Sequence, residues 1–309
     1  MTRSLQTRSA HIRHAGFAAL ASLCLATSPA MAQQPFNTPD EAAAALAAAV
    51  KSGAKPDILK VLGADGEDIV SSGDDVADTE ARSKFTSAYD ARHSVKVDGK
   101  KASLIVGPDD FPFPIPLVRS KAGWEFDTDE GRKEILFRRI GRNELDTIQT
   151  CLAFVDAENE YADKDHGDGV GAYAQRIVST PGKQDGLYWK SDNNDSPLGA
   201  LAAEAAAEGY KAGGEPQPYH GYYYRILVGQ GQSAPGGSLS YVIKGKMIGG
   251  FALVAWPADY GNSGVMTFIV NHAGVVYQKD LGKETEAAAK RMMWFDPDRS
   301  WTKVEASKP

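Results

Sequence analysis

The spacing of apolar positions predicts helices in the first part of the chain. Alanine and leucine residues recur from residue 39 to about residue 50, and this run ends at Ser52-Gly53. Thr38 and Glu41 have the three-residue spacing of a capping box just before the run, which predicts where the helix begins. Two further helices are predicted in the same way, over residues 57–62 and 77–89.

After residue 93 apolar and polar positions alternate, which is the period of a strand. One hairpin is predicted around Asp98 and Gly99, because this pair favours tight turns, and another around residues 121–123. Helices followed by strands predict an α+β module with a curved antiparallel sheet over residues 33–130.

The second part of the chain has the pattern of one long helix followed by strands. Residues 132–161 contain no proline and a single glycine, which favours a long helix. A loop-rich stretch over residues 163–214 holds a further predicted helix at residues 198–208. Five strand-like runs follow, at residues 221–228, 240–244, 251–256, 265–270 and 274–279. We therefore expect a long helix packed on an antiparallel meander in residues 131–309.

The first residues carry the three parts of a secretory signal peptide. An apolar run over residues 15–26 follows a basic segment and precedes the small residues Ala30 and Ala32, which fit a cleavage site. The run is too short for a transmembrane helix, which needs about 20 residues. We therefore expect residues 1–32 to be removed, leaving no transmembrane helix and a protein of the periplasm or the extracellular space.

The two cysteines lie in different settings. Cys24 belongs to the predicted signal peptide, and a lipid anchor on it is the alternative to cleavage, although Leu23 stands where a small residue normally precedes such a cysteine. Cys151 lies beside an apolar stripe of the predicted long helix, which indicates a buried structural thiol. With one cysteine left after cleavage, no intramolecular disulfide is expected.

The charge of the chain limits its partners. The formal net charge is −6, and removal of the three arginines of the predicted signal peptide makes it −9. Nucleic acids and anionic lipid surfaces are bound by clustered Lys and Arg side chains. The acidic balance therefore predicts that the protein does not bind nucleic acid.

Three aspartates after the predicted long helix have a spacing close to that of a calcium loop. Asp163, Asp165 and Asp168 supply the hard oxygen ligands that calcium prefers, and the glycine before Asp168 permits a sharp turn. The aspartate spacing is broken by one position and no Glu follows at the bidentate position, so a polar turn is the alternative. Calcium is the one cofactor that the sequence suggests. The acidic residues between positions 65 and 78 are instead predicted to cap helices within a solvated loop.

Local catalytic motifs are absent from the sequence. The Gly261 to Gly264 stretch does not have the spacing of a nucleophile elbow, and there is no zinc-protease or phosphate-binding motif. The predicted mature chain keeps four histidines, each isolated in sequence: His93, His166, His220 and His272. A protein without enzymatic activity is therefore favoured, and a hydrolase whose His, Ser and Asp residues meet in space, with His220 and Ser263 as candidates, is the alternative.

Tyr222, Tyr223 and Tyr224 form the densest aromatic cluster. In a strand, alternation places Tyr222 and Tyr224 on one face and Tyr223 on the other. A sheet that fills its own core with these rings is favoured. The alternative is an exposed aromatic row that binds glycan or a protein partner.

Four longer strings of the sequence resemble one family along nearly the whole chain after residue 32: residues 107–116, 137–145, 179–189 and 261–268. They resemble an uncharacterised bacterial family, domain of unknown function 2950. The resemblance implies a secreted bacterial protein and assigns no catalytic residues. Within it, residues 143–162 and the late strands resemble the helix and meander of pilin-like domains.

These observations lead to one expectation about fold and function. The fold class is α+β, with a signal peptide at residues 1–32, an α+β module at residues 33–130 and a pilin-like domain at residues 131–309. The expected function is that of an exported protein without enzymatic activity in binding or envelope assembly, with envelope proteins or glycan as partners. The exported hydrolase remains the alternative function.

Overall fold

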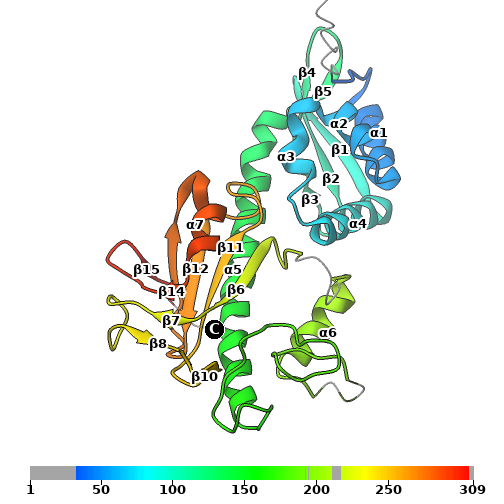
Figure 1. Cartoon of the computed structure of the whole chain (residues 1–309). Coiled ribbons are helices and arrows are strands. Elements are labelled where there is room, and N and C mark those ends of the chain that lie inside the picture. The colour runs from blue at the N-terminus through cyan, green and yellow to red at the C-terminus, as the bar shows by residue number, and fades with distance from the viewer. Residues whose placement is uncertain (1–32, 192, 194, 211–216, 306–309) are drawn as a thin grey trace, which may run out of the picture. The chain divides into compact units, whose positions relative to one another are not determined.

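The computed structural model describes residues 33–191, 193, 195–210 and 217–305 (Figure 1). The predicted signal peptide, with Cys24, lies outside the described residues. The described elements form an α+β fold, as the sequence predicts. Among these residues, no helix combines the length and the apolar character that a membrane span requires.

Helices precede strands in the first part of the chain. The helices are α1 (Pro39–Ser52), α2 (Lys55–Leu62), η1 (Ala64–Gly66), α3 (Glu67–Val70) and α4 (Asp75–Ala91). The strands are β1 (His93–Asp98), β2 (Lys101–Val106), β3 (Phe111–Pro112), β4 (Leu117–Arg119) and β5 (Trp124–Phe126). They form an antiparallel sheet in the order β1-β2-β4-β5, and β3 pairs with β2.

Local rules account for the start of this part. The Thr38 hydroxyl accepts a hydrogen bond from the Glu41 N–H at 3.1 Å, and the Glu41 carboxylate accepts one from the Asn37 N–H, so the predicted capping box is confirmed. Asp98 pairs with Lys101 across the first hairpin, which leaves a two-residue turn as predicted.

The long helix α5 (Thr128–Ala162) contributes to two hydrophobic cores. Near its start, Ile135 and Leu136 pack on the core of the first helices and strands. Further along, Cys151 and Phe154 belong to the core of the later strands. The helix begins four residues before the predicted start, because the Asp127 carboxylate caps it by accepting from the Glu130 N–H at 3.1 Å. The predicted boundary at residue 130 stays a prediction.

The later elements are built around an antiparallel sheet with the order β15-β13-β12-β11-β6. Its strands are β6 (Tyr222–Leu227), β11 (Ala252–Pro257), β12 (Met266–Asn271), β13 (Tyr277–Asp280) and β15 (Thr302–Lys303). Short strands form two smaller sheets: β7 (Gly229–Gln230), β8 (Leu239–Ser240) and β14 (Trp294–Phe295) in one, β9 (Val242–Ile243) and β10 (Lys246–Met247) in the other. The remaining helices are α6 (Gly199–Glu208), η2 (Gly282–Glu284) and α7 (Thr285–Arg291).

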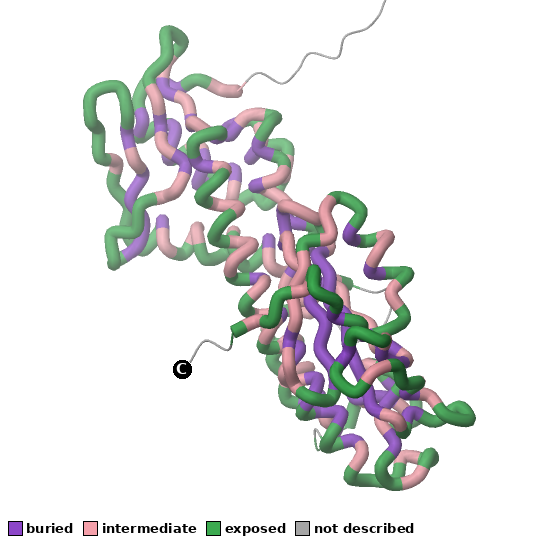
Figure 2. The backbone as a smooth tube through the Cα atoms, turned by 90° about the vertical axis from the view of Figure 1, so that its left-hand side faces the viewer, coloured by how far each residue is buried: buried purple, intermediate pink, exposed green. Residues whose placement is uncertain are grey.

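Helices pack on both faces of the larger sheet, and its middle strands are the most buried part of it (Figure 2). Two successive residues of β6 point to the two opposite faces of this sheet. The Tyr224 hydroxyl lies 3.3 Å from the Thr147 hydroxyl on α5, whereas the Arg225 guanidinium donates to the Ala289 carbonyl of α7 at 2.7 Å. The predicted packing of a long helix on an antiparallel meander is confirmed.

The structure differs from the predicted strands at two places. The predicted strand at residues 240–244 is divided into β8 and β9, because the Tyr241 ring is fully buried and its hydroxyl donates to the Gln230 side chain at 2.8 Å. The last predicted strand begins only at Tyr277. Before it, the Gly274 N–H donates to the Asn271 carbonyl, so the predicted turn forms and the chain needs more residues to return to the sheet.

Candidate functional site

A strained turn before β6 presents His220. Tyr219 and Tyr222 exchange both backbone hydrogen bonds, at 2.8 and 3.1 Å, around His220 and Gly221. The φ angles of these two central residues are 50° and 74°, which is the conformation of a type I′ turn. Few residues other than glycine adopt a left-handed φ, and such positions are concentrated at functional sites. The left-handed φ of His220 therefore makes this residue a candidate for a functional site.

Both ring nitrogens of His220 face carboxylates from different helices. Nδ1 lies 3.2 Å from a carboxylate oxygen of Asp146 on α5, and Nε2 lies 3.4 Å from a carboxylate oxygen of Glu208 at the end of α6. The ring thus stands between two acidic groups, and neither nitrogen is left to activate a hydroxyl nucleophile.

Asp74, which lies in the N-terminal part of the chain, forms a hydrogen bond with the same turn. One oxygen of its carboxylate accepts from the Tyr210 hydroxyl at 2.8 Å and from the Gly221 N–H at 2.9 Å. The other oxygen caps α4 by accepting two backbone N–H groups. The Tyr210 hydroxyl oxygen in turn accepts from the His220 N–H at 3.3 Å. Burial and the bond to Asp74 raise the pKa of the Tyr210 hydroxyl, which keeps it a donor.

The prediction of a solvated acidic loop between positions 65 and 78 is wrong for two aspartates, Asp74 and Asp78. Asp74 is 2% exposed and Asp78 is 8% exposed. The Asp78 carboxylate accepts from the Ser72 N–H at 2.9 Å, and the Ser72 hydroxyl accepts from the Asp74 N–H. The predicted capping role of the acidic residues is correct for Asp74, but the solvated setting is wrong for both, because their carboxylates satisfy buried backbone donors.

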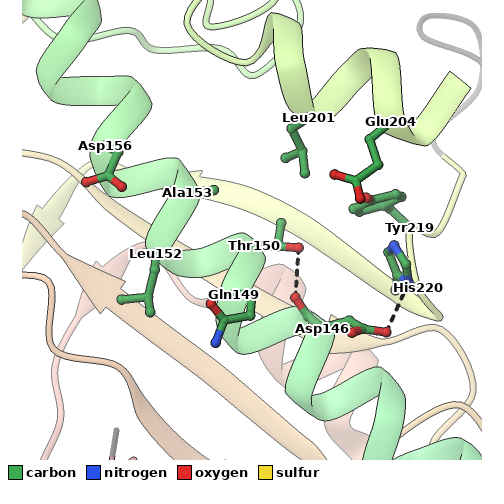
Figure 3. Close-up of a pocket in the computed structure, with 10 residues that line it drawn as sticks. All are labelled: Asp146, Gln149, Thr150, Leu152, Ala153, Asp156, Leu201, Glu204, Tyr219 and His220. Carbon is green, nitrogen blue, oxygen red and sulfur yellow. Dashed lines mark hydrogen bonds and ion pairs between the residues drawn. The ribbon is translucent and has the colours of Figure 1, made fainter. Parts of the chain in front are cut away.

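The His220 turn forms one wall of a pocket of about 370 Å³ (Figure 3). Helix α5 forms a second wall and α6 a third. In Figure 3 the Glu204 side chain extends from α6 towards the Tyr219 ring, and Asp146 points at His220 from α5. The lining residues are Asp146, Gln149, Thr150, Leu152, Ala153, Asp156, Leu201, Glu204, Tyr219 and His220.

Carboxylates dominate the charge of this pocket. Asp146, Asp156 and Glu204 line it, and Glu208 lies behind the His220 ring. Within the described ranges, no Lys or Arg side chain comes within 4.0 Å of any of these four carboxylates. Burial raises the pKa of Glu208; His220 opposes this shift, and the neighbouring acidic side chains add to it. Burial and the same acidic groups also raise the pKa of Tyr219. The pocket is thus a region of negative potential.

Ser263 does not join His220 in a catalytic arrangement. The Ser263 side chain is fully buried, and its hydroxyl donates to the Asp259 carbonyl and accepts from the Asp259 N–H at 2.9 Å. Thr150, a hydroxyl that lines the pocket, donates to the Asp146 carbonyl at 2.9 Å. In the part of the chain that the structure describes, no serine or threonine hydroxyl forms a hydrogen bond with a histidine ring.

The three aspartates proposed for calcium do not converge. One oxygen of the Asp165 carboxylate accepts from the N–H groups of Gly167 and Gly169 at 2.8 and 2.9 Å, which lowers its pKa. Asp168 uses its backbone carbonyl to accept from Lys246. Asp163 ends α5 as its C-cap residue. The described residues contain no cluster of three or more acidic, His or Cys side chains placed to hold a metal ion, and the calcium hypothesis stays a prediction.

The tyrosine cluster alternates across β6 as predicted. Tyr222 is fully buried and its hydroxyl donates to the Met266 carbonyl at 3.0 Å. Tyr224 lies on the same face, towards α5. Tyr223 packs against Trp256 on the other face, with ring centroids 5.8 Å apart. The three rings therefore do not form one exposed row.

Cys151 is fully buried, and burial raises the pKa of its thiol to about 12. A thiol needs a depressed pKa to act as a nucleophile near neutral pH. The predicted structural role of this cysteine is confirmed.

Most residues of the pocket carry no local sequence signal. His220 is the only one of them that sequence reasoning selects. On α5, Asp146, Thr150, Ala153 and Asp156 recur at spacings of three and four, which places them on one face of the helix. Glu204 and Glu208 stand one turn apart on α6, but nothing local indicates which element they face.

Comparison with known proteins identifies one family. A family model described as a protein of unknown function (DUF2950) matches residues 33–304. No curated protein and no solved structure matches the chain. The likeness to pilin-like domains stays a prediction.

Proposed function

Since the chain belongs to DUF2950, a family of unknown function, we propose its function from the site itself: it is an exported binding protein that holds a small cationic group. The pocket between α5, α6 and the His220 turn is the binding site. A primary amine is the chemical class that fits it best. The export half of the proposal rests on the signal-peptide pattern in residues 1–32.

One observation carries the proposal. Asp146, Asp156 and Glu204 line one pocket, and no described Lys or Arg side chain neutralises them. Like charges gathered in one site repel one another. Glu208, behind the His220 ring, has a pKa that burial raises most and that Glu204 and Asp146 also raise, while His220 lowers it. A bound cation removes this repulsion, so the pocket favours a ligand with positive charge.

Size and aromatic character support the same ligand class. A volume of about 370 Å³ lies at the small end of ligand pockets, which span roughly 300–1,000 Å³. The Tyr219 ring lines the pocket beside Glu204, and an aromatic face attracts cations. Leu152 and Leu201 give apolar surface for the carbon chain of the ligand. An alkyl amine matches all three features.

The decisive experiment compares a cation with a neutral molecule of the same shape. The chain from residue 33 onward is titrated calorimetrically with cadaverine and, separately, with 1,5-pentanediol. We expect heat of binding for the diamine alone. The variants Asp146→Asn and Glu204→Gln are each expected to weaken binding of the diamine about tenfold, the effect of removing one charge-assisted contact of roughly 1.4 kcal/mol.

A matched control keeps the net charge change the same. Glu160→Gln removes one carboxylate from the exposed surface of α5 outside the pocket, and it is expected to leave affinity unchanged. Equal binding of the diol, or equal effects of Glu160→Gln and Asp146→Asn, contradicts the proposal. Absence of binding by cadaverine contradicts it as well.

A further inference from the structure

We propose that a second pocket, at the C-terminal end of α5, binds an uncharged carbohydrate. This pocket has a volume of about 670 Å³ and is lined by Tyr161 of α5 and by the loops that follow. None of the described residues lines both pockets. The inference is independent of the proposed binding of a cation.

Aromatic side chains in fixed positions line part of this pocket. The Tyr161 hydroxyl donates to the Gln184 carbonyl at 3.0 Å, and the His166 ring stacks on Tyr161 with centroids 4.0 Å apart. The Tyr173 ring packs against Phe251, with centroids 4.8 Å apart. Tyr161 is itself buried, so the rings that this packing fixes at the pocket surface are those of His166 and Tyr173. The faces of such preorganised aromatic rings attract the C–H groups of a sugar ring.

The charged side chains of the lining balance one another. Arg176 and Lys183 contribute two cations, and Asp168 and Asp185 contribute two carboxylates. A ligand with one sign of charge therefore meets as many like charges as opposite charges. A sugar hydroxyl both donates and accepts, so a polyhydroxylated ring uses both kinds of group.

Several of these polar groups have no partner of their own. Within the described residues, the side chains of Arg176 and Lys183 and the carboxylate of Asp168 make no hydrogen bond or ion pair.

Asp185 gives the lining a fixed acceptor. Its carboxylate accepts from the Thr180 N–H at 2.7 Å and from the Thr180 hydroxyl at 2.8 Å, which lowers its pKa and keeps it ionised. Each carboxylate oxygen has a lone pair left for another donor. The loop at residues 180–185 therefore supplies a fixed acceptor in the lining of the pocket.

Saturation-transfer NMR on the chain from residue 33 onward tests this inference. The probes are glucose, mannose, galactose and N-acetylglucosamine, with galacturonate and glucosamine as the charged counterparts. We expect transfer to at least one neutral sugar, strongest at its ring C–H protons because these lie on the aromatic faces. Arg176→Gln and Lys183→Gln are expected to weaken its binding about fivefold, the effect of roughly 1 kcal/mol per lost donor.

The controls separate this pocket from other surfaces. Lys190→Gln removes an exposed cation outside the pocket, and Asp146→Asn changes the other pocket; both variants are expected to bind the sugar as the unmodified chain does. Both Arg176 and Lys183 are exposed, so their replacement leaves the core intact. Binding of no neutral sugar, binding of the charged sugars alone, or unchanged binding by Arg176→Gln overturns the inference.

Discussion

The Asp74 carboxylate accepts a hydrogen bond from the backbone N–H of Gly221 at 2.9 Å, across 147 residues of the chain. The same carboxylate caps α4, so the end of one helix is joined to the turn that presents His220. A buried carboxylate with four hydrogen bonds has a large effect when it is removed, because each donor is left unsatisfied.

Replacement of Asp74 tests this connection. Asp74→Ala is expected to lower the free energy of unfolding by about 2–4 kcal/mol, since it removes a helix cap and leaves the Tyr210 hydroxyl and the Gly221 N–H without an acceptor. Asp74→Asn keeps acceptor oxygen and is expected to cost less. Denaturant unfolding measures both. Asp75→Ala, at an exposed neighbour in the first turn of α4, is the control, and an equal loss in Asp75→Ala contradicts the prediction.

Gly221 itself is required for two separable reasons. Its φ of 74° is left-handed, and a Cβ atom there would lie 2.6 Å from the Asn143 side-chain nitrogen. Gly274 has a similar φ of 70°, and among the described residues other than its two chain neighbours no atom lies within 4 Å of the corresponding Cβ position. Gly274→Ala is therefore expected to cost about 1–2 kcal/mol from the backbone alone, and Gly221→Ala about 2 kcal/mol more from the clash. Equal losses in thermal or denaturant unfolding would show that Asn143 moves aside without cost.

The buried carboxyl group of Glu158 is expected to make the stability of the folded protein depend on pH. Its side chain is fully buried on α5, one oxygen accepts from the Ala174 N–H at 2.8 Å, and burial raises its pKa well above 4.5. The folded protein therefore retains this proton at pH values where the unfolded chain has lost it. The stabilisation that the protonated Glu158 gives the folded state is complete below 4.5, the pKa of this group in the unfolded chain. It is lost, at about 1.4 kcal/mol per pH unit, as the pH rises through the pKa of Glu158 in the folded protein.

The variant Glu158→Gln isolates this effect. It cannot ionise, so the difference in unfolding free energy between it and the unmodified chain is expected to shift in its favour as pH rises above 4.5. Denaturant titrations at several pH values between 4.5 and 9 measure the difference. Glu160→Gln, at an exposed site on the same helix, is expected to show no such trend, and a difference for Glu158→Gln that does not change with pH contradicts the prediction.

Cys151 is expected to be inert in the folded protein. Its thiol is fully buried with a pKa of about 12, so a thiol reagent at pH 8 is expected to react only as fast as the protein unfolds. Reaction with a chromogenic disulfide in buffer and in denaturant measures this. Rapid labelling of the folded chain would show that the core around Cys151 opens.

Short-range rules were sufficient for much of the fold. The capping box at Thr38 and the turn after Asp98 depend on residues within three or four positions of each other, so the printed order of residues contains the whole interaction. The length of α5 follows from the lack of proline over thirty residues. These elements are predicted correctly because the interactions that form them are local.

The candidate site depends on contacts that no local rule describes. Tyr210 and Asp74 are 136 residues apart, and His220 meets Asp146 and Glu208 from two different helices. Isolated carboxylates on a helix surface are usually solvated, so the sequence gives no reason to place Asp74 inside the protein.

By itself the sequence determined the α+β class, the family and the helices and hairpins whose signals lie within a few residues. Tertiary structure alone decided which polar side chains meet. The hydrophobic effect, which has no directional preference, packs α5 on the sheet, and this packing brings Asp146 to His220. Hydrogen bonds then select the arrangement in which buried groups such as the Asp74 carboxylate find partners, a condition that only the assembled chain can satisfy.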